Sequence, residues 1–275
     1  MSDRIGRYVT DAGFAAAVVR CPATVEEVCV RQHGLGPRPA TMLGEAIVAG
    51  LLLGTRLKGP GLLTAALAGE GAFRHFRVDA IGLGSVRAMV LPSTHEALAA
   101  WNGVDPLLSD GVLTVERRLQ DDTQPYQSKL LVAGDAIPSV FNQFLVASEQ
   151  VMAAIAVRVS DGEAVGVYVE RLPGADVTHP LNELVIEMRD ANSHPALNEA
   201  DNAALLSALC PEATFRELHA YDVGFHCPCS RDRYIATLRG FKQTELTSLT
   251  NGAGVIETVC DFCRTRYDIP LDEVL

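Results

Sequence analysis

The cysteines of this 275-residue chain crowd toward its C-terminal end, and their spacing constrains the fold more than any other feature. Four of the seven cysteines form a C-x-C pair and a C-x-x-C pair, with thirty residues between the pairs: Cys227, Cys229, Cys260 and Cys263. Four thiolates in two close pairs suit a tetrahedral zinc site with Zn–S bonds of about 2.3 Å. The spacing therefore predicts a small C-terminal module that holds one Zn²⁺ ion per chain.

The residues around the two pairs favour a metal-binding module. Residues 255–259 alternate as in a β-strand, residues 260–263 predict a tight knuckle, and residues 264–269 predict the returning strand. Between the pairs, residues 231–239 predict a helix whose apolar face is formed by Tyr234, Ile235 and Leu238. A helix and a hairpin of this kind could wrap around one metal ion.

Charged neighbours of the cysteines are open to two interpretations. Four thiolates and one Zn²⁺ ion carry a net negative charge, and nearby arginines could offset it or form a solvated surface: Arg231, Arg233, Arg264 and Arg266. His226 precedes Cys227, but four cysteines already fill a tetrahedral shell, so we expect this histidine at the surface or beside a ligand. A filled shell leaves no position for water, which argues against zinc-dependent hydrolysis.

The N-terminal residues predict a cytoplasmic protein. Residues 1–8 are polar and lack the apolar core of a signal peptide, so we expect the thiols to stay in a reducing compartment. The longest apolar stretch, between Glu45 and Arg56, falls short of the roughly 20 residues that cross a membrane. Three cysteines lack nearby partners in the sequence and are assigned no role: Cys21, Cys29 and Cys210.

Hydrophobic patterning predicts the α+β class and divides the chain into three parts. Residues 1–174 predict a core domain with antiparallel sheet and packed helices. Residues 175–223 are polar, contain several prolines and lack strand signals, so we expect a linker of short amphipathic helices. Such a segment could open easily or could be an ordinary helical subdomain. Residues 224–275 form the cysteine module.

Individual elements of the core domain are expected at defined positions. The strands are expected at 11–20, 62–68, 71–80, 85–91, 112–119 and 126–133, followed by a hairpin of 151–159 and 164–172 around Asp161-Gly162. The helices are expected from Thr24 to Gly34 with a capping box of Thr24 and Glu27, from Pro39 to about Leu57, and from Ile137 to Ala147.

The size of the cysteine module favours a regulatory role, although a static zinc ribbon stays open on spacing alone. A segment of 52 residues is marginal for independent folding. Structural zinc contributes about 10–16 kcal/mol, as much as the whole stability of a typical domain, about 5–15 kcal/mol. Oxidation of the thiolates would therefore unfold the module and remove any support that it gives to residues 175–223.

The sequence resembles the bacterial redox-regulated heat-shock chaperones of the 33 kDa chaperonin (heat-shock protein 33) family. The resemblance rests on residues 225–233 (FHCPCSRDR) and 259–267 (VCDFCRTRY), which carry the C-x-C and C-x-x-C pairs at the family's spacing. Further matches are Ala147-Ser-Glu-Gln150, Asn102-Gly103 and Leu67-Ala-Gly-Glu-Gly71. Arg264 stands where the family often has glycine, which bears on how tightly the knuckle closes.

This resemblance implies a function that composition and spacing do not reveal. The reduced protein would hold zinc through the four cysteines and be a poor chaperone. Peroxide with heat, or hypochlorous acid, would form the disulfides Cys227–Cys229 and Cys260–Cys263 and release the metal. The module and the linker would then unfold, dimers would be favoured, and unfolding client proteins would be held without ATP until ATP-driven foldases receive them. No enzymatic activity is expected.

Two other functions are weighed against this one. The first is a static zinc ribbon that binds nucleic acid or takes part in transcription, but the net charge of −11 disfavours nucleic acid, and acidic residues outnumber basic ones within 224–275. The second is a thiol oxidoreductase, but residues 260–263 lack the βαβ context of a redox C-x-x-C. The chain also lacks G-x-S-x-G and phosphate-binding glycine motifs.

Overall fold

The computed structural model describes residues 2–69, 73–82, 84–92, 108–134, 136–160, 162–191 and 193–275. The chain divides into two compact units, Met1–Phe225 and His226–Leu275. The predicted α+β class with antiparallel sheets is confirmed. Asn102-Gly103, Asp161 and part of the match at residues 67–71 lie outside the described residues.

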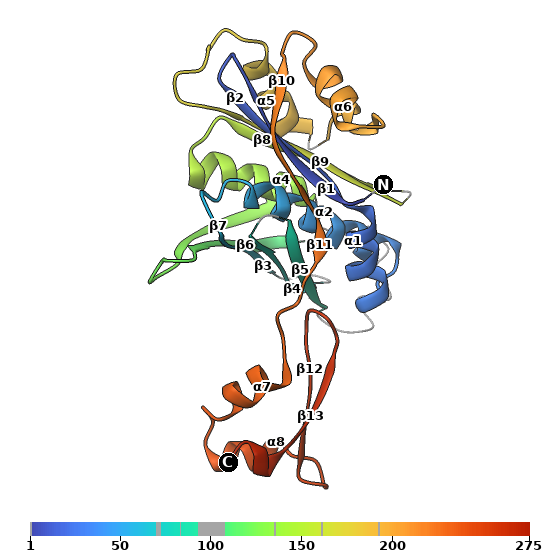
Figure 1. Cartoon of the computed structure of the whole chain (residues 1–275), viewed down its shortest axis with the longest axis vertical. Helices are drawn as coiled ribbons and strands as arrows, with labels where there is room; N and C mark the ends of the chain where they lie inside the picture. The colour runs from blue at the N-terminus through green and yellow to red at the C-terminus, as the bar shows by residue number, and fades with distance from the viewer. Residues whose placement is uncertain are drawn as a thin grey trace. The chain divides into compact units, whose positions relative to one another are not determined.

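The larger unit contains two sheets. In the described part of the chain, the first has five antiparallel strands in the order β10-β1-β2-β9-β8 (Figure 1). These strands are β1 (Arg4–Thr10), β2 (Phe14–Arg20), β8 (Ala153–Ser160), β9 (Glu163–Arg171) and β10 (Phe215–Asp222).

The second sheet has six described strands in the order β11-β5-β4-β3-β6-β7, and only the β11–β5 pair is parallel among them. They are β3 (Gly61–Gly69), β4 (Phe73–Ile81), β5 (Ser85–Pro92), β6 (Leu108–Leu119), β7 (Tyr126–Gly134) and β11 (Gly224–Phe225).

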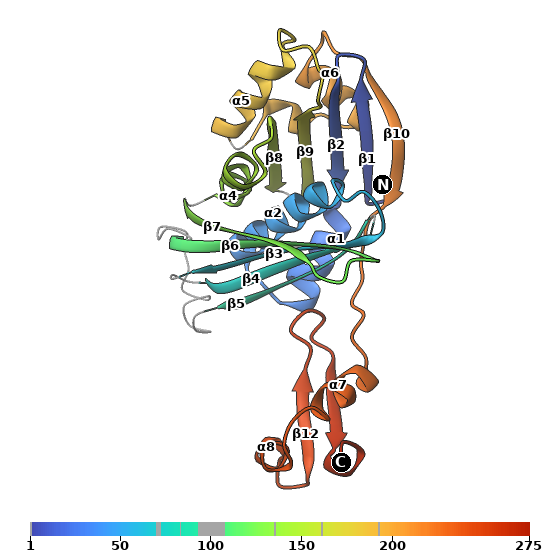
Figure 2. The same ribbon diagram turned by 90° about the vertical axis from the view of Figure 1, so that its left-hand side faces the viewer.

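Helix α2 (Pro37–Gly54) lies between the two sheets and contacts strands of both (Figure 2). Its residues 46–54 are apolar on every side, as expected of a helical segment with no solvent-facing stripe. A Cβ atom at Gly166 of β9 would collide with the side chain of Val48, so this glycine lets helix and sheet approach closely. The other described helices before residue 175 are α1 (Pro22–Glu26), η1 (Glu27–Gln32), α4 (Ile137–Phe144) and η2 (Leu145–Glu149).

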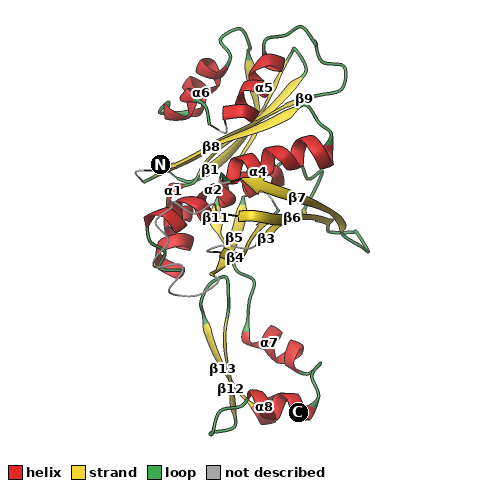
Figure 3. Cartoon of the chain, turned by 180° about the vertical axis from the view of Figure 1, so that it is seen from behind, coloured by secondary structure: helices red, strands yellow, loops and turns green. Residues whose placement is uncertain are grey.

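The opposite face of the five-stranded sheet is covered by residues of the expected linker (Figure 3). Helix α5 (Leu181–Ala191), the 3₁₀ helix η3 (Pro195–Asn198) and α6 (Asn202–Leu209) pack their apolar side chains on it. The prediction that residues 175–223 contain no strand is wrong, because β10 pairs with β1 at the sheet edge. Most side chains of β10 are not buried, so an edge strand of this kind carries little alternation in its sequence.

Three further points about the larger unit need correction. Strand β1 was not predicted, although it lies between β10 and β2. The capping box of Thr24 and Glu27 does not form, because α1 already begins at Pro22 and Thr24 Oγ1 donates instead to Asp3 Oδ2 at 2.6 Å. Helix α2 runs from Pro37 to Gly54 and not from Pro39 to Leu57. The other expected strands and the helix at 137–147 are confirmed within a few residues.

The smaller unit has helices α7 (Arg231–Leu238) and α8 (Gln243–Leu249), the antiparallel hairpin of β12 (Val255–Val259) and β13 (Arg266–Pro270), and the 3₁₀ helix η4 (Leu271–Glu273). Its hydrophobic cluster has five buried members: Ile235, Leu246, Ile256, Ile269 and Val274. The helix and hairpin predicted around the cysteines are confirmed. Among the described residues, no helix has both the length and the apolar character that crossing a membrane requires.

Candidate metal centre

The four cysteines predicted as ligands converge in the smaller unit. Their Sγ atoms all lie within 4.8 Å of one another. Cys227 and Cys229 belong to the loop that precedes α7, and Cys260 and Cys263 belong to the turn between β12 and β13. All seven cysteines of the chain are free thiols, and the other three lie outside this cluster.

The separations between sulfur atoms suit a tetrahedral metal ion. Cys227 Sγ is 3.8 Å from Cys260 Sγ, and Cys229 Sγ is 3.3 Å from Cys263 Sγ. A tetrahedron of bonds of about 2.3 Å has edges of about 3.8 Å. Each of these two contacts joins one sulfur of the C-x-C loop to one sulfur of the C-x-x-C turn. A bound ion would therefore connect two segments that are thirty residues apart in the sequence.

The C-x-x-C turn closes tightly, and Arg264 adopts the conformation that closure requires. The amide of Cys260 donates to the carbonyl of Thr265 at 2.9 Å, and the amide of Arg264 donates to the carbonyl of Cys260 at 2.8 Å. Arg264 has a φ of 57°, in the left-handed region that favours glycine. The knuckle therefore forms with arginine at this position, at a cost in backbone strain.

Two polar side chains from the hairpin contact the sulfur atoms. Tyr267 Oη lies 3.2 Å from Cys229 Sγ, and Thr265 Oγ1 lies 3.2 Å from Cys263 Sγ. Burial raises the pKa of Cys229 to about 12. Burial also opposes ionisation of Cys263, but hydrogen bonds with Thr265, Cys229 and Cys260 outweigh it and lower the pKa of Cys263 to about 7. Spacing gave no signal for Tyr267 or Thr265, because their positions depend on the register of the hairpin.

The four nearby arginines differ in what they contact. Arg231 forms an ion pair with Glu273, with Nη2 2.7 Å from Oε1, and Arg266 pairs with Glu257 and Asp268. Arg233 Nη1 donates to the carbonyl of Pro228, between the two cysteines of the first pair, at 2.7 Å. This hydrogen bond stabilises the conformation of the C-x-C loop. His226 is not a member of the thiol cluster.

The remaining cysteines are buried in the larger unit. Cys21 and Cys29 have no exposed surface, and Cys210 is 3% exposed. Burial raises the pKa of Cys29 to about 12 and also raises the pKa of Cys21 and Cys210. Buried thiols with raised pKa values react slowly with oxidants.

Fold and site together define the chain as an α+β protein with a small four-cysteine module suited to metal binding. A two-sheet α+β body is joined to a small unit in which four thiols form a closed cluster with the donor set of a structural metal site.

Comparison with known proteins places the chain within a family. The sequence model of the family described as "Hsp33 protein" matches residues 3–270. The chain is 28% identical over 264 residues to the 33 kDa chaperonin of Bacillus subtilis, which covers 89% of this chain and 87% of the relative. It is 27% identical over 285 residues to the 33 kDa chaperonin of Pelobacter propionicus, at 100% and 93% coverage. The chain belongs to the Hsp33 family.

A solved structure supports the same fold. The crystal structure of the 33 kDa chaperonin (heat shock protein 33 homolog) of Thermotoga maritima superposes with a TM-score of 0.82. The two chains share 22% sequence identity, and the superposition covers 100% of this chain and 97% of the other. The predicted family resemblance is confirmed.

Proposed function

We propose that this protein is a redox-regulated chaperone that holds unfolding proteins without ATP and is inactive while its four cysteines hold zinc. The observation that carries the proposal is the convergence of the four Sγ atoms within 4.8 Å, in a unit whose hydrophobic cluster has five buried members. Membership of the Hsp33 family and the names of its curated relatives support a chaperone.

Zinc is the ion that best fits the site. The donors are four sulfur atoms, a set that suits Zn²⁺ and excludes hard cations such as Mg²⁺ and Ca²⁺. Bound zinc would act as a structural cross-link worth about 10–16 kcal/mol. Because the hydrophobic cluster of this unit is small, we infer that the unit depends on the ion for its folded state.

Oxidation would remove the ligands. Each disulfide forms when two thiols lose two electrons and two protons to one molecule of hydrogen peroxide, which is reduced to two molecules of water. We propose the pairs Cys227–Cys229 and Cys260–Cys263. These local disulfides leave the C-x-C loop and the C-x-x-C turn unconnected, whereas disulfides between the loop and the turn would replace the metal as a cross-link. Local pairing is therefore the arrangement that unlocks the unit.

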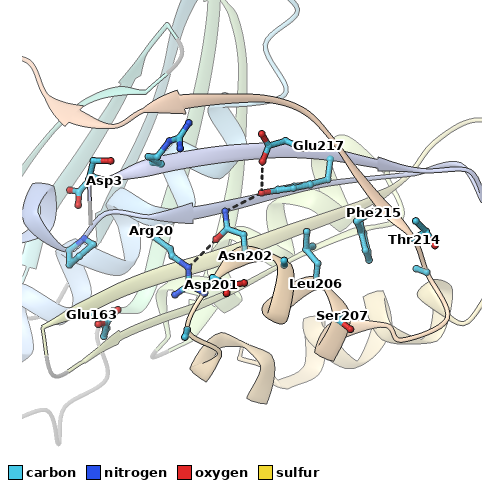
Figure 4. A pocket seen from close by; sticks show the side chains of 17 residues that line it. Asp3, Arg20, Glu163, Asp201, Asn202, Leu206, Ser207, Thr214, Phe215 and Glu217 are labelled. Atoms are coloured by element: carbon cyan, nitrogen blue, oxygen red, sulfur yellow. Dashed lines mark hydrogen bonds between the residues drawn. The ribbon is translucent and has the colours of Figure 1, made fainter.

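Residues 175–223 are the segment that we propose to be released. Their docking on the five-stranded sheet combines the apolar faces of α5 and α6 with a chain of polar contacts (Figure 4). Arg20 Nε donates to Asn202 Oδ1 at 3.0 Å, and Asn202 Nδ2 donates to Tyr8 Oη at 3.2 Å. Tyr8 Oη in turn donates to Glu217 Oε2 of β10 at 3.1 Å.

Residues 175–223 do not fill all the space against the five-stranded sheet, and this incomplete packing favours their release. A cavity of about 980 Å³ opens between α6, β10 and the adjoining strands β1 and β2, with charged side chains on its wall. Release of the segment would uncover the apolar sheet face beneath α5 and α6, formed by Phe14, Val18, Val165, Val167 and Val169. We propose this face and the inner faces of the helices as the surface that holds clients. Dimerisation, transfer of clients to ATP-driven foldases and a cytoplasmic location belong to the same proposal.

One experiment tests metal, switch and activity together. Reduced, zinc-loaded protein is treated with hydrogen peroxide at raised temperature, while zinc release and the aggregation of a heat-unfolded client are followed in one sample. We expect one zinc per chain to leave and aggregation to be suppressed in parallel. Cys263→Ser should retain little zinc, whereas the matched control Cys210→Ser, outside the cluster, should retain it fully. Failure of the oxidised, zinc-free protein to suppress aggregation would contradict the proposal.

A further inference from the structure

A second cavity lies on the face of the five-stranded sheet opposite to α5 and α6. Its volume is about 740 Å³, within the range of about 300–1,000 Å³ that is usual for small-ligand sites. Strands β1, β2 and β9 form its floor, and residues 55–59, which follow α2, form a wall. Leu172, Pro173 and Leu218 of β10 complete the described lining. The cavity contains none of the cysteines.

The charge of this cavity is opposite to that of the chain. Its described lining contains three cationic side chains, Arg7, Arg56 and Lys58, and one carboxylate, Glu170. The chain as a whole carries a net charge of −11. A cluster of one sign inside a concave surface focuses the field and attracts ligands of the other sign. The cavity therefore suits an anion.

Two of the three cations remain available to a ligand. Arg56 is already paired, with Nη1 2.7 Å from Glu149 Oε2 and Nη2 3.3 Å from Glu170 Oε1. Glu170 also accepts a hydrogen bond from the hydroxyl of Tyr168 at 2.6 Å. In contrast, the side chains of Arg7 and Lys58 have no hydrogen-bond or ion-pair partner among the described residues. Two unpaired positive charges on one cavity match a ligand head group with two negative charges.

The rest of the lining suits an apolar or aromatic ligand body. The floor carries the small side chains of Ala15 and Ala17, and the walls include Val9, Leu57 and Leu218. Leu218 is 42% exposed, although a large apolar side chain in a cavity wall gains free energy when it is covered. Arginine binds phosphate oxygens in bidentate fashion, and lysine adds a point charge.

We propose that this cavity binds a phosphate monoester with an organic body of nucleotide size, with Arg7 and Lys58 contacting the phosphate and the apolar walls contacting the body. The site is separate from the thiol cluster and does not depend on the proposed redox function. Binding requires no hydrolysis of the ligand.

Titration calorimetry on the full-length, zinc-loaded, reduced protein tests the proposal, with AMP and inorganic phosphate as probes. We expect saturable binding of AMP, with weaker binding of inorganic phosphate and an affinity for both that falls as salt is added. Arg7→Ala and Lys58→Ala should each weaken AMP binding by about tenfold or more, as expected from the loss of one hydrogen bond to a charged group. The matched controls Arg74→Ala and Lys129→Ala remove exposed cations from the six-stranded sheet and should leave it unchanged.

Lys58 is exposed beyond the end of α2, so Lys58→Ala is informative even where Arg7→Ala disturbs strand β1. Circular dichroism and zinc content verify that each variant is folded. Two results would overturn the proposal: the wild type fails to bind AMP at millimolar concentration, or the folded Lys58→Ala variant binds AMP as tightly as the wild type. Equal affinities for AMP and inorganic phosphate would overturn the assignment of an organic body.

Discussion

Cys229 Sγ lies 3.3 Å from Cys263 Sγ, so the two halves of the cysteine motif meet sulfur to sulfur although thirty residues separate the pairs. Cys227 and Cys260 form the second contact of this kind. The folded unit therefore offers oxidants two ways to form disulfides, within each pair or between the pairs. Only the first removes the connection between the C-x-C loop and the hairpin.

Disulfide mapping distinguishes these two outcomes. After peroxide treatment at raised temperature, we expect mass spectrometry of the digested protein to find Cys227–Cys229 and Cys260–Cys263. The reason is that unfolding of the small unit separates the loop from the turn, while the cysteines of each pair stay within three residues of one another. Dominant Cys227–Cys260 and Cys229–Cys263 links would contradict the proposed switch, because they would keep the unit cross-linked.

Replacement of Arg264 by glycine should strengthen the reduced state. A left-handed residue other than glycine costs roughly 1–2 kcal/mol, and the greater freedom of glycine in the unfolded chain offsets part of the gain. Arg264→Gly should therefore stabilise the zinc-loaded unit by about 0.5–1 kcal/mol. The measurement is zinc retention against a competing chelator. Asp261→Gly, in the same turn but without a positive φ, should weaken retention; equal effects of both variants would show that Arg264 is unstrained.

The hydroxyl of Tyr8 should control how firmly α6 and β10 stay docked. Tyr8→Phe removes a donor to Glu217 and an acceptor for Asn202, which leaves both side chains without that partner. The loss of two such contacts costs about 1–3 kcal/mol. Hydrogen exchange should show faster opening of residues 202–222 in the reduced protein, and less peroxide should be needed for activation.

Tyr126→Phe is the matched control for this change. Tyr126 is 57% exposed, and its ring, which lies under Arg117, survives the substitution. We expect unchanged exchange in residues 202–222. Equal exchange in Tyr8→Phe and in the wild type would show that the apolar contacts of α5 and α6 alone hold the segment.

Local patterns predicted which four cysteines cluster, because the spacing of the two pairs lies within short stretches of sequence. The C-x-C and C-x-x-C pairs identified the four thiols, and the run of apolar residues before Gly59-Pro60-Gly61 identified α2. Strand β10 was not predicted, because its side chains are solvated and its structure depends on backbone pairing with β1 at the sheet edge. The sequence also did not predict that Arg7 and Lys58 line one cavity, because only the packing of β1 against the residues after α2 brings them together.

Glu149 gives a physical reason for the resemblance to the Hsp33 family at residues 147–150. This carboxylate is 8% exposed and pairs with Arg56, after α2, and with Arg117 of β6, at 2.7 and 2.8 Å. Arg56 also reaches Glu170 of β9, so the network connects the six-stranded sheet to the five-stranded sheet. A sequence pattern alone could not show this link, because its four members are distant along the chain.

Removal of the central charge should therefore destabilise the larger unit. Glu149→Gln leaves two partly buried arginines without their carboxylate, a change that costs about 3–5 kcal/mol when a buried pair is broken. Because Arg117 is 28% exposed and water compensates part of the loss, we expect about 2–3 kcal/mol. The measurement is the urea midpoint of the larger unit at neutral pH. Glu116→Gln, which removes the exposed pair with Arg118, should change the free energy of unfolding by less than about 0.5 kcal/mol. Similar losses in both variants would mean that the buried network contributes no more than a surface ion pair.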